Sequence, residues 1–328
     1  MKKKINKIGV LTSGGDSPGM NAAVRSVVRT CAYHHLECVG IYRGFEGMIE
    51  GDFSPMDARS VRDIINRGGT LLKSARSKDF MTKEGRQKAY DSLKKEGIDA
   101  LVLIGGDGTF TGGLVFYREF DFPCIGIPGT IDNDIIGTDQ TLGYDTALNT
   151  AVEAIDKIRD TASSHNRLFF IEVMGRDVGH IALNAGLGAG AEEILMPEET
   201  LGLERLVESL KRSKDSGKTS SLVVVAEGDK TGKNVFELKD YVDEHLEGYD
   251  VRVAVLGHMQ RGGSPSCADR VMACRMGVKA VESLMAGEYN YMVGSQNDKM
   301  VLYPLELAIK GGSKLNKELI RVSQIMTT

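Results

Sequence analysis

The sequence predicts an α/β protein with two three-layer αβα domains and mainly parallel sheets. Short runs of Val, Ile and Leu alternate with segments of helical periodicity along most of the 328 residues. These runs lack the polar–apolar alternation of half-exposed strands, which indicates strands that are buried on both faces. Strands that alternate with helices pair in parallel through right-handed crossovers. Since domains typically have about 100–200 residues, the length predicts two of them.

The elements can be placed in chain order. Seven segments are expected to form strands, namely 8–12, 38–42, 101–104, 124–127, 168–173, 222–226 and 251–256. The clearest helices are expected at 18–34, at 144–163, and from Ser264-Pro265 to Met285. Asp16 or Ser17 is the expected N-cap of the first helix, because Pro18 suits an opening turn.

Composition and charge exclude several classes of protein. Lys and Arg number 41 against 45 Asp and Glu, a net charge of -4, which argues against a basic nucleic-acid-binding or membrane-binding surface. No apolar run has the 18 or so residues of a membrane span, and no signal-peptide core follows the basic first residues. The five cysteines have no metal-like spacing and fit a reducing compartment. We expect a cytoplasmic protein that binds neither nucleic acid nor membranes.

Glycine together with charged or hydroxyl residues follows six of the expected strands. The segments are 13–16, 105–109, 128–134, 174–176, 227–228 and 257–263. Ligands of open α/β sheets bind outside the carboxyl ends of the strands. Turn geometry and helix capping could account for any one of these segments, but they account poorly for six. We therefore expect a ligand site built from these loops.

Two of the loops have the shape of phosphate sites. Gly14-Gly15 and 106–109 lead into expected helices, whose N-termini offer backbone N–H groups to an anion. Neither is a GxxxxGK[ST] loop, and no GxGxxG follows the first strand, so NAD binding has weak support. Asp107 could hold a divalent cation beside phosphates, or it could simply cap a helix.

The segment 130–134 suggests the chemistry of the site. Asp132 follows a strand end, where a carboxylate could accept the proton of an attacking hydroxyl, the base role in phosphoryl transfer. Arginine bonds two phosphate oxygens at once. Five arginines and one histidine stand near the same strand ends, namely Arg76, Arg167, Arg176, Arg252, Arg261 and His258. As a set they predict a phosphorylated substrate.

Five motifs together resemble those of the bacterial ATP-dependent 6-phosphofructokinases. They are 11–21 (LTSGGDSPGMN), 104–108 (IGGDG), 128–134 (PGTIDND), 172–176 (EVMGR) and 257–265 (GHMQRGGSP). The Gly-Gly-Asp-Gly sequence also occurs in NAD kinases and lipid kinases. The third and fifth motifs in combination are highly specific. The resemblance extends from about Lys7 to Gly294.

The resemblance implies a homotetrameric glycolytic kinase with its active site in a cleft between two domains. The enzyme would transfer the γ-phosphoryl group of Mg-ATP to the 1-hydroxyl of fructose 6-phosphate, giving fructose 1,6-bisphosphate and ADP. Residues 1–142 with 258–308 would bind ATP, and residues 143–257 with 309–328 would bind fructose 6-phosphate.

The resemblance also implies roles for individual residues. Asp132 would be the base, Thr130 would position substrate and phosphate, and Arg176 and Arg76 would neutralise the transferred group. ATP would be bound by Gly15, Arg76, Ser77, Gly106, Asp107, Gly108 and Thr109, with Asp107 holding Mg²⁺. Fructose 6-phosphate would be bound by Thr130, Asp132, Arg167, Met174, Gly175, Arg176, Glu227, Arg252, His258 and Arg261. Arg167 resembles the residue that reaches into a neighbouring subunit's site.

An effector site is implied as well, for ADP or phosphoenolpyruvate. Its residues would be Arg25, Arg29, Arg59, Arg159, Glu192 and Lys218. Ser216 stands where a Lys is common, and the missing charge predicts weak regulation. A solvated helix face is the alternative interpretation of Arg25 and Arg29.

Three other functions are weighed against this one. Pyrophosphate-dependent relatives carry Asp where Gly108 stands and Lys where Gly129 stands, so both glycines favour ATP. An NAD kinase would have no use for the loop 257–265. A non-catalytic sensor of nucleotide and sugar phosphate would not need a base such as Asp132.

Overall fold

The structure is a computed structural model that describes residues 4–164, 167–199, 202–217, 220–312 and 314–326. Two compact units make up the chain. Residues 1–146 and 261–312 form the first unit, and residues 147–260 and 313–328 form the second. None of the helices in the described part combines the length and apolar character needed to cross a membrane.

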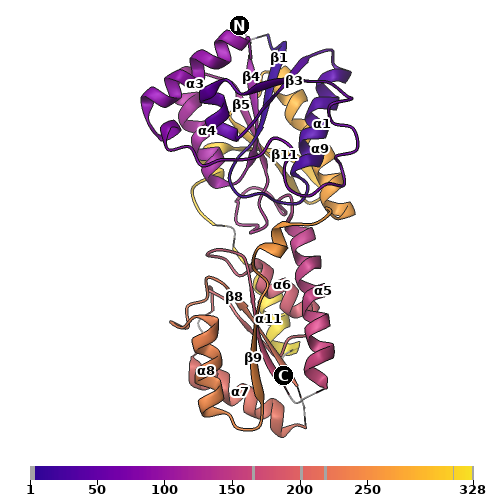
Figure 1. The fold of residues 1–328 in the computed structure, drawn as a ribbon, viewed down its shortest axis with the longest axis vertical. Coiled ribbons are helices and arrows are strands. Elements are labelled where there is room, and N and C mark those ends of the chain that lie inside the picture. Colours follow the sequence, from indigo (N-terminus) through magenta and orange to yellow (C-terminus); the bar gives the residue numbers. More distant parts are fainter. Residues whose placement is uncertain (1–3, 165–166, 200–201, 218–219, 313, 327–328) are drawn as a thin grey trace. The chain divides into compact units, whose positions relative to one another are not determined.

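A seven-stranded sheet organises the first unit (Figure 1). In sheet order its strands are β11 (Lys299–Pro304), β10 (Tyr291–Gln296), β5 (Cys124–Pro128), β4 (Ala100–Gly105), β1 (Lys7–Thr12), β2 (Glu37–Ile41) and β3 (Phe53–Met56). The helical elements are α1 (Met20–Tyr33), α2 (Gly44–Glu50), η1 (Asp79–Met81), α3 (Lys83–Glu96), α4 (Asp107–Phe120), α9 (Cys267–Met285) and α10 (Leu305–Ala308). β1, β2, β4, β5 and β10 run parallel, and the two edge strands are antiparallel.

Helices cover both faces of this sheet. Ile8 and Val10 of β1 pack with α1 and α9 on one face, whereas Leu11 packs with α2, α3 and α4 on the other. This double burial explains why the strands are apolar at successive positions. β1 lies between β2 and β4, so the strand order reverses next to it, and the crevice outside the carboxyl ends of β1 and β4 is where such sheets bind ligands.

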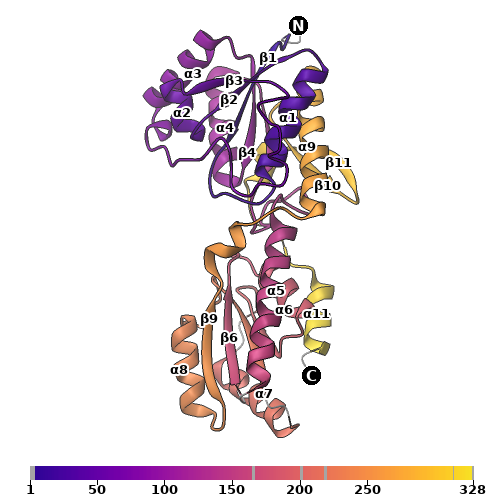
Figure 2. The ribbon, with the colours of Figure 1, turned by 45° about the vertical axis from the view of Figure 1, so that its right-hand side comes forward.

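The second unit contains a four-stranded parallel sheet in the order β7-β8-β6-β9. The strands are β6 (Arg167–Val173), β7 (Glu193–Leu195), β8 (Ser221–Ala226) and β9 (Asp250–Val255). The helical elements are α5 (Tyr144–Ser163), which begins in the first unit, α6 (His180–Gly188), α7 (Leu203–Asp215), α8 (Val235–His245), η2 (Gly257–Arg261) and α11 (Lys317–Met326). α7 and α8 share one hydrophobic core with the sheet, and Figure 2 shows α8 on one side of the sheet and α5, α6 and α11 on the other.

The mixed α/β fold and all seven expected strands are confirmed, but the starts of two helices differ from expectation. α1 begins at Met20 after Gly19, which has a φ of 97°, so neither Asp16 nor Ser17 is its N-cap. The left-handed backbone of Gly19 separates Pro18 from the helix, and Gly143 packs against this segment, where an added Cβ would lie 2.7 Å from Ser17 Cβ and 3.0 Å from Pro18 Cδ. α9 begins at Cys267, capped by the Ser266 side chain rather than by Ser264-Pro265.

Candidate active site

Three loops meet at the carboxyl ends of β1, β4 and β5. The Ser13 N–H donates to the Ile104 carbonyl at 3.0 Å, and the Gly129 N–H donates to the Gly105 carbonyl at 3.0 Å. A Cβ atom at Gly105 would collide with the Ser13 carbonyl oxygen, so this close approach requires glycine. The loops after the three strands therefore lie side by side at the reversal of strand order.

The N-terminus of α4 is open to a ligand. Gly106 is the N-cap, and Asp107 is the first helical residue, which excludes the alternative that Asp107 is the cap. A Cβ at Gly108 would have no atom within 4 Å. The Thr109 hydroxyl is buried and has no hydrogen-bond partner among the described residues. The backbone N–H groups at this helix start are thus placed where an anion could bind.

Asp132 lies in the neighbouring loop and is only 3% exposed. The Thr130 hydroxyl donates to Asp132 Oδ2 at 3.3 Å and accepts from the Asp132 N–H at 3.2 Å. Asn133, with a φ of 52°, holds the segment that follows, because its side chain donates to the Asp139 carbonyl and accepts from the Thr141 N–H. The carboxylate is therefore set in a fixed loop beside the start of α4.

Arg261 approaches the first glycine loop. Its Nη1 donates to the Asp16 carbonyl at 3.3 Å, and a Cβ at Gly15 would collide with the guanidinium group. Arg261 is a predicted sugar-phosphate residue, and it lies in the first unit beside a predicted nucleotide residue. Arg76 is exposed on a segment tied to this loop by Ser74, whose hydroxyl donates to the Gly14 carbonyl at 2.8 Å, a contact that the sequence did not suggest.

A second group of predicted residues lies at the carboxyl ends of β6 and β8. Met174 is buried, and both Gly175 (φ 143°) and Arg176 (φ 55°) have positive φ. Glu227 Oε1 accepts the Arg176 N–H at 2.7 Å and the Gly175 N–H at 3.3 Å. His258 is exposed in η2, just beyond β9. These residues meet at one edge of the second sheet.

Negative charge is concentrated at this edge. Burial raises the pKa of Glu172, and the nearby carboxylates of Glu227 and Asp229 raise it further. Sequence reasoning did not single out Glu172, although it opens the motif 172–176. A cation or a phosphate-bound arginine here would relieve the repulsion between these carboxylates.

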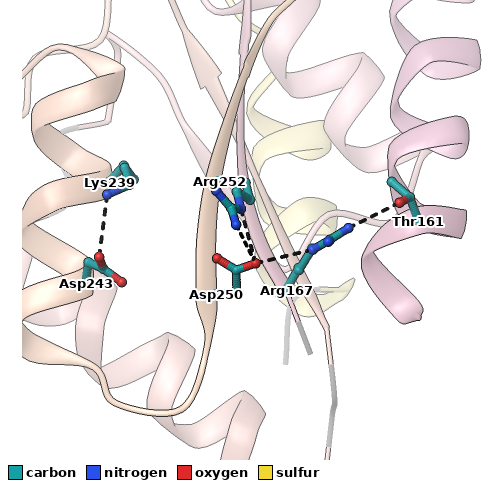
Figure 3. A network of polar contacts seen from close by, with 6 residues as sticks. All are labelled: Thr161, Arg167, Lys239, Asp243, Asp250 and Arg252. Atoms are coloured by element: carbon teal, nitrogen blue, oxygen red, sulfur yellow. Dashed lines mark hydrogen bonds and ion pairs between the residues drawn. The ribbon is translucent and has the colours of Figure 1, made fainter. Parts of the chain in front are cut away.

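Arg167 and Arg252 do not lie at this edge, which corrects their expected place at the strand ends with the other site residues. Arg167 is the first residue of β6 and pairs in register with Asp250, the first residue of β9. Asp250 Oδ2 accepts from Arg252 at 2.9 and 3.1 Å and from Arg167 at 3.4 Å (Figure 3). Hydrogen bonds from Arg252 lower the pKa of Asp250, and Arg167 contributes to the shift.

The separation follows from the geometry of the strand. Six residue steps of roughly 3.3 Å place Arg167 about 20 Å from Val173 along β6. The strands are parallel, so their starts and ends lie at opposite edges of the sheet. Arg252 pairs in register with Phe169, four steps or about 13 Å from Val173, and its guanidinium group is bound to Asp250 at the start of β9. Within one chain, both guanidinium groups therefore lie away from a small molecule that Gly175 and Glu227 hold.

The predicted effector residues are divided between the two units. Arg25 and Arg29 line a cavity of about 380 Å³ between α1 and α9, and Arg59 lies on an exposed loop of the same unit. In the second unit Arg159 Nη2 donates to the carbonyls of Ala189 and Gly190 at 2.6 Å each, next to the end of α6. Buried Glu192 lies 3.9 Å from Arg159, and Lys218 lies outside the described residues.

Comparison with known proteins gives a consistent result. The profile of the family described as phosphofructokinase matches residues 7–284. The chain is 52% identical to "ATP-dependent 6-phosphofructokinase 1" of Thermus thermophilus, covering 98% of this chain and 99% of that protein. It is 51% identical to "ATP-dependent 6-phosphofructokinase 2" of Bacteroides thetaiotaomicron, covering 96% of each. A structure of phosphofructokinase from Saccharomyces cerevisiae superposes with a TM-score of 0.89 at 36% identity. That match covers 99% of this chain and 47% of the yeast chain.

Proposed function

The chain belongs to the phosphofructokinase family, and on that premise we propose how its residues catalyse the reaction of an ATP-dependent 6-phosphofructokinase. The chain is a kinase that phosphorylates fructose 6-phosphate with ATP. The observation that carries the residue assignment is the pair Thr130 and Asp132. Their buried, hydrogen-bonded loop lies beside the start of α4, where a Cβ at Gly106 would lie 3.9 Å from Thr130 Cβ.

Asp132 accepts the proton of the 1-hydroxyl of fructose 6-phosphate as that oxygen attacks the γ-phosphorus of ATP. Thr130 keeps the carboxylate oriented through the two contacts described above. Arg76 and Arg176 balance the negative charge of the transferred group, since guanidinium groups bond phosphoryl oxygens in pairs. The products are fructose 1,6-bisphosphate and ADP.

Space at two glycines supports ATP over pyrophosphate as the donor. Gly108 has open space around it, which suits the α-phosphate of ATP. A Cβ at Gly129 would lie 3.1 Å from Met20 Cε and 3.3 Å from Ile104 Cγ2, so a longer side chain would have to displace buried neighbours. The Asp and Lys expected of pyrophosphate-dependent enzymes are absent from these two positions.

Asp107 is the residue that would hold Mg²⁺. No three His, Cys, Asp or Glu side chains gather into a cation site in the described part of the chain. One carboxylate beside a phosphate-binding helix start is nevertheless the usual protein share of a Mg²⁺ site, in which phosphates and water supply the other ligands. Bound there, the ion would neutralise phosphate charge.

Arg167 and Arg252 serve a second copy of the chain. They lie at the edge of the second sheet opposite to Gly175 and Glu227, so in a homotetramer they would bind the fructose 6-phosphate held by a neighbour. The sequence analysis gave only Arg167 a role in a neighbouring subunit's site. Arg252 is now assigned the same role. The enzyme acts in the cytoplasm, with ADP or phosphoenolpyruvate as candidate effectors.

A coupled assay tests the function directly. Purified enzyme is given fructose 6-phosphate with either ATP or pyrophosphate, with and without Mg²⁺, and ADP and fructose 1,6-bisphosphate are quantified. We expect turnover with ATP and Mg²⁺, and none with pyrophosphate or without Mg²⁺. Turnover with pyrophosphate would reverse the assignment of the donor, and binding of both substrates without turnover would indicate a sensor. Phosphorylation of NAD in place of the sugar would indicate an NAD kinase.

A further inference from the structure

The backbone of Arg176 has an unusual conformation. Its φ of 55° lies in the left-handed region, which non-glycine residues seldom adopt. Such a conformation persists only where the surrounding structure imposes it. The turn that follows β6 supplies one constraint, because the Val178 N–H donates to the Gly175 carbonyl at 3.1 Å. The rest comes from the turn that follows β8.

Both sides of Arg176 are enclosed by two consecutive residues after β8. Glu227 Oε1 accepts the Arg176 N–H at 2.7 Å. On the other side, a Cβ at Gly228 would lie 3.1 Å from the Arg176 carbonyl carbon, 3.3 Å from Asp177 Cα, and closer still to the Arg176 carbonyl oxygen. Gly228 itself does not have the positive φ that would require glycine. Glycine is needed here because the Arg176 backbone occupies the space of a side chain.

The turn that carries Gly228 has little freedom to move away. The Glu227 N–H donates to the Val173 carbonyl at 3.0 Å, which ties the start of the turn to β6. The Asp229 N–H donates to the Ala226 carbonyl at 3.0 Å, and the Asp229 carboxylate accepts from the Thr231 N–H at 2.8 Å. A methyl group at Gly228 would therefore displace Arg176 rather than the turn.

We propose that Gly228 is a positioning residue for the reaction. By leaving room for the Arg176 carbonyl, it lets the Glu227 carboxylate hold the Arg176 N–H, and the two contacts together fix the direction in which the guanidinium group extends. The inference rests on the proposed function, in which Arg176 balances the charge of the transferred phosphoryl group. A displacement of about 1 Å at such a group can lower a rate roughly 100-fold.

The test compares Gly228→Ala with Gly188→Ala, a matched control in the same unit. The added methyl at Gly188 would have its nearest neighbour at 3.7 Å, an ordinary contact with Val152. We expect Gly228→Ala to lower kcat about 10- to 100-fold, with a small change in the KM for ATP. The control should keep the kcat of the parent enzyme.

A double-variant cycle separates positioning from general damage. If Gly228 acts through Arg176, Gly228→Ala should add little to the loss already caused by Arg176→Ala, whereas independent effects multiply. Glu227→Gln removes the charge of the carboxylate that accepts the Arg176 N–H. It replaces Gly228→Ala in the same cycle if that variant does not fold. Multiplying effects, or a Gly228→Ala enzyme as fast as the control, would overturn the inference. A parent enzyme that fails to phosphorylate fructose 6-phosphate would instead reject the proposed function.

Discussion

The two edges of the four-stranded sheet in the second unit are built for different tasks. At the carboxyl ends of β6 and β8, backbone N–H groups and carboxylates surround Gly175 and Arg176. At the opposite edge, Arg167 and Arg252 share the single carboxylate of Asp250. The first edge has an excess of negative groups around main-chain donors, and the second has an excess of positive side chains.

In the proposed mechanism, residues of one reaction lie at both ends of the same strand. A parallel sheet holds its strand starts and strand ends about 20 Å apart here, too far for one sugar phosphate. Residues at the carboxyl ends can act on a substrate bound to their own chain. We propose that the arginines at the amino ends bind a substrate held by another copy, as symmetric subunits that exchange contacts allow.

The largest expected effect concerns a carboxyl-end residue of the first unit. Asp132→Asn keeps the size of the buried side chain but removes the base, so kcat should fall roughly 10²–10⁴-fold, with little change in the KM for fructose 6-phosphate. Asp139→Asn is the control, because Asp139 is exposed further along the same segment and the amide oxygen can still accept the Asn297 N–H, so kcat should change little. Steady-state kinetics with near-normal kcat for Asp132→Asn would remove this residue from the base role.

Mixing variants tests the separation of the two edges. Arg167→Ala or Arg252→Ala should raise the KM for fructose 6-phosphate about 10- to 150-fold, since each removes a charge-assisted contact of about 1.5–3 kcal/mol. After subunit exchange, Arg252→Ala mixed with Glu227→Ala should restore about a quarter of the sites, those that draw one intact edge from each copy.

The matched control is a mixture of Arg167→Ala with Arg252→Ala. Both changes lie at the same edge, so every site formed by exchange still lacks one arginine and activity should not return. Mass spectrometry of the mixture establishes that exchange has occurred. Recovery in this control, or none in the Arg252→Ala and Glu227→Ala mixture, would refute the division between the edges.

The sequence predicted the fold well because burial on both faces leaves a plain apolar signature. It missed the edge strands β3, β7 and β11, and it missed the interior strand β10, in which Gly294, Ser295 and Gln296 weaken the apolar signature. One signal was available, since Asn297 and Asp298 form a two-residue hairpin turn with φ values of 48° and 59°, a turn that Asn and Asp favour.

The kinds of residue in the candidate site were easier to predict from the sequence than their positions in the fold. The glycine-rich loops and Asp132 follow strands directly, so their common edge could be inferred from the chain order. Arg167 and Arg252 lie near the beginnings of strands. The sequence indicated that they are close to strands but did not indicate which end of each strand they occupy. Gly228 could not be found at all, because its proposed role depends on a contact with Arg176, 52 residues earlier.

A substitution at Gly108 sharpens the assignment of the nucleotide loop. Gly108→Asp would place a carboxylate in open space, so the fold should persist while the KM for ATP rises about 10- to 100-fold through repulsion of phosphate. Gly108→Asn has the same size without the charge and should have a clearly smaller effect. Equal effects would indicate crowding, and unchanged ATP kinetics for both variants would remove the nucleotide from this loop.

The smallest expected effect is on thermal stability, which should respond in opposite directions to the removal of a carboxylate at each of the two edges. The pKa of Glu172 is raised above 4.5 by burial and by Glu227 and Asp229, so the folded state binds more protons than the unfolded state as the pH rises from 4.5 through the folded pKa. Stability falls in that window and the loss persists above it. Glu172→Gln cannot ionise, so above the window it should unfold about 1–3 °C higher than the parent, with no difference below pH 4.5.

Asp250→Asn at the other edge should show the opposite sign. Arg252 and Arg167 lower the pKa of Asp250 below 3.8, so its ionised form contributes stability above pH 3.8, and that contribution disappears as the pH falls through the folded pKa. The variant should therefore unfold slightly below the parent at neutral pH and converge with it in acid. Thermal unfolding of both variants between pH 3 and pH 8 measures the contrast. If both variants change the unfolding temperature in the same direction at neutral pH, the two edges do not have the opposite charge balance that their contacts indicate.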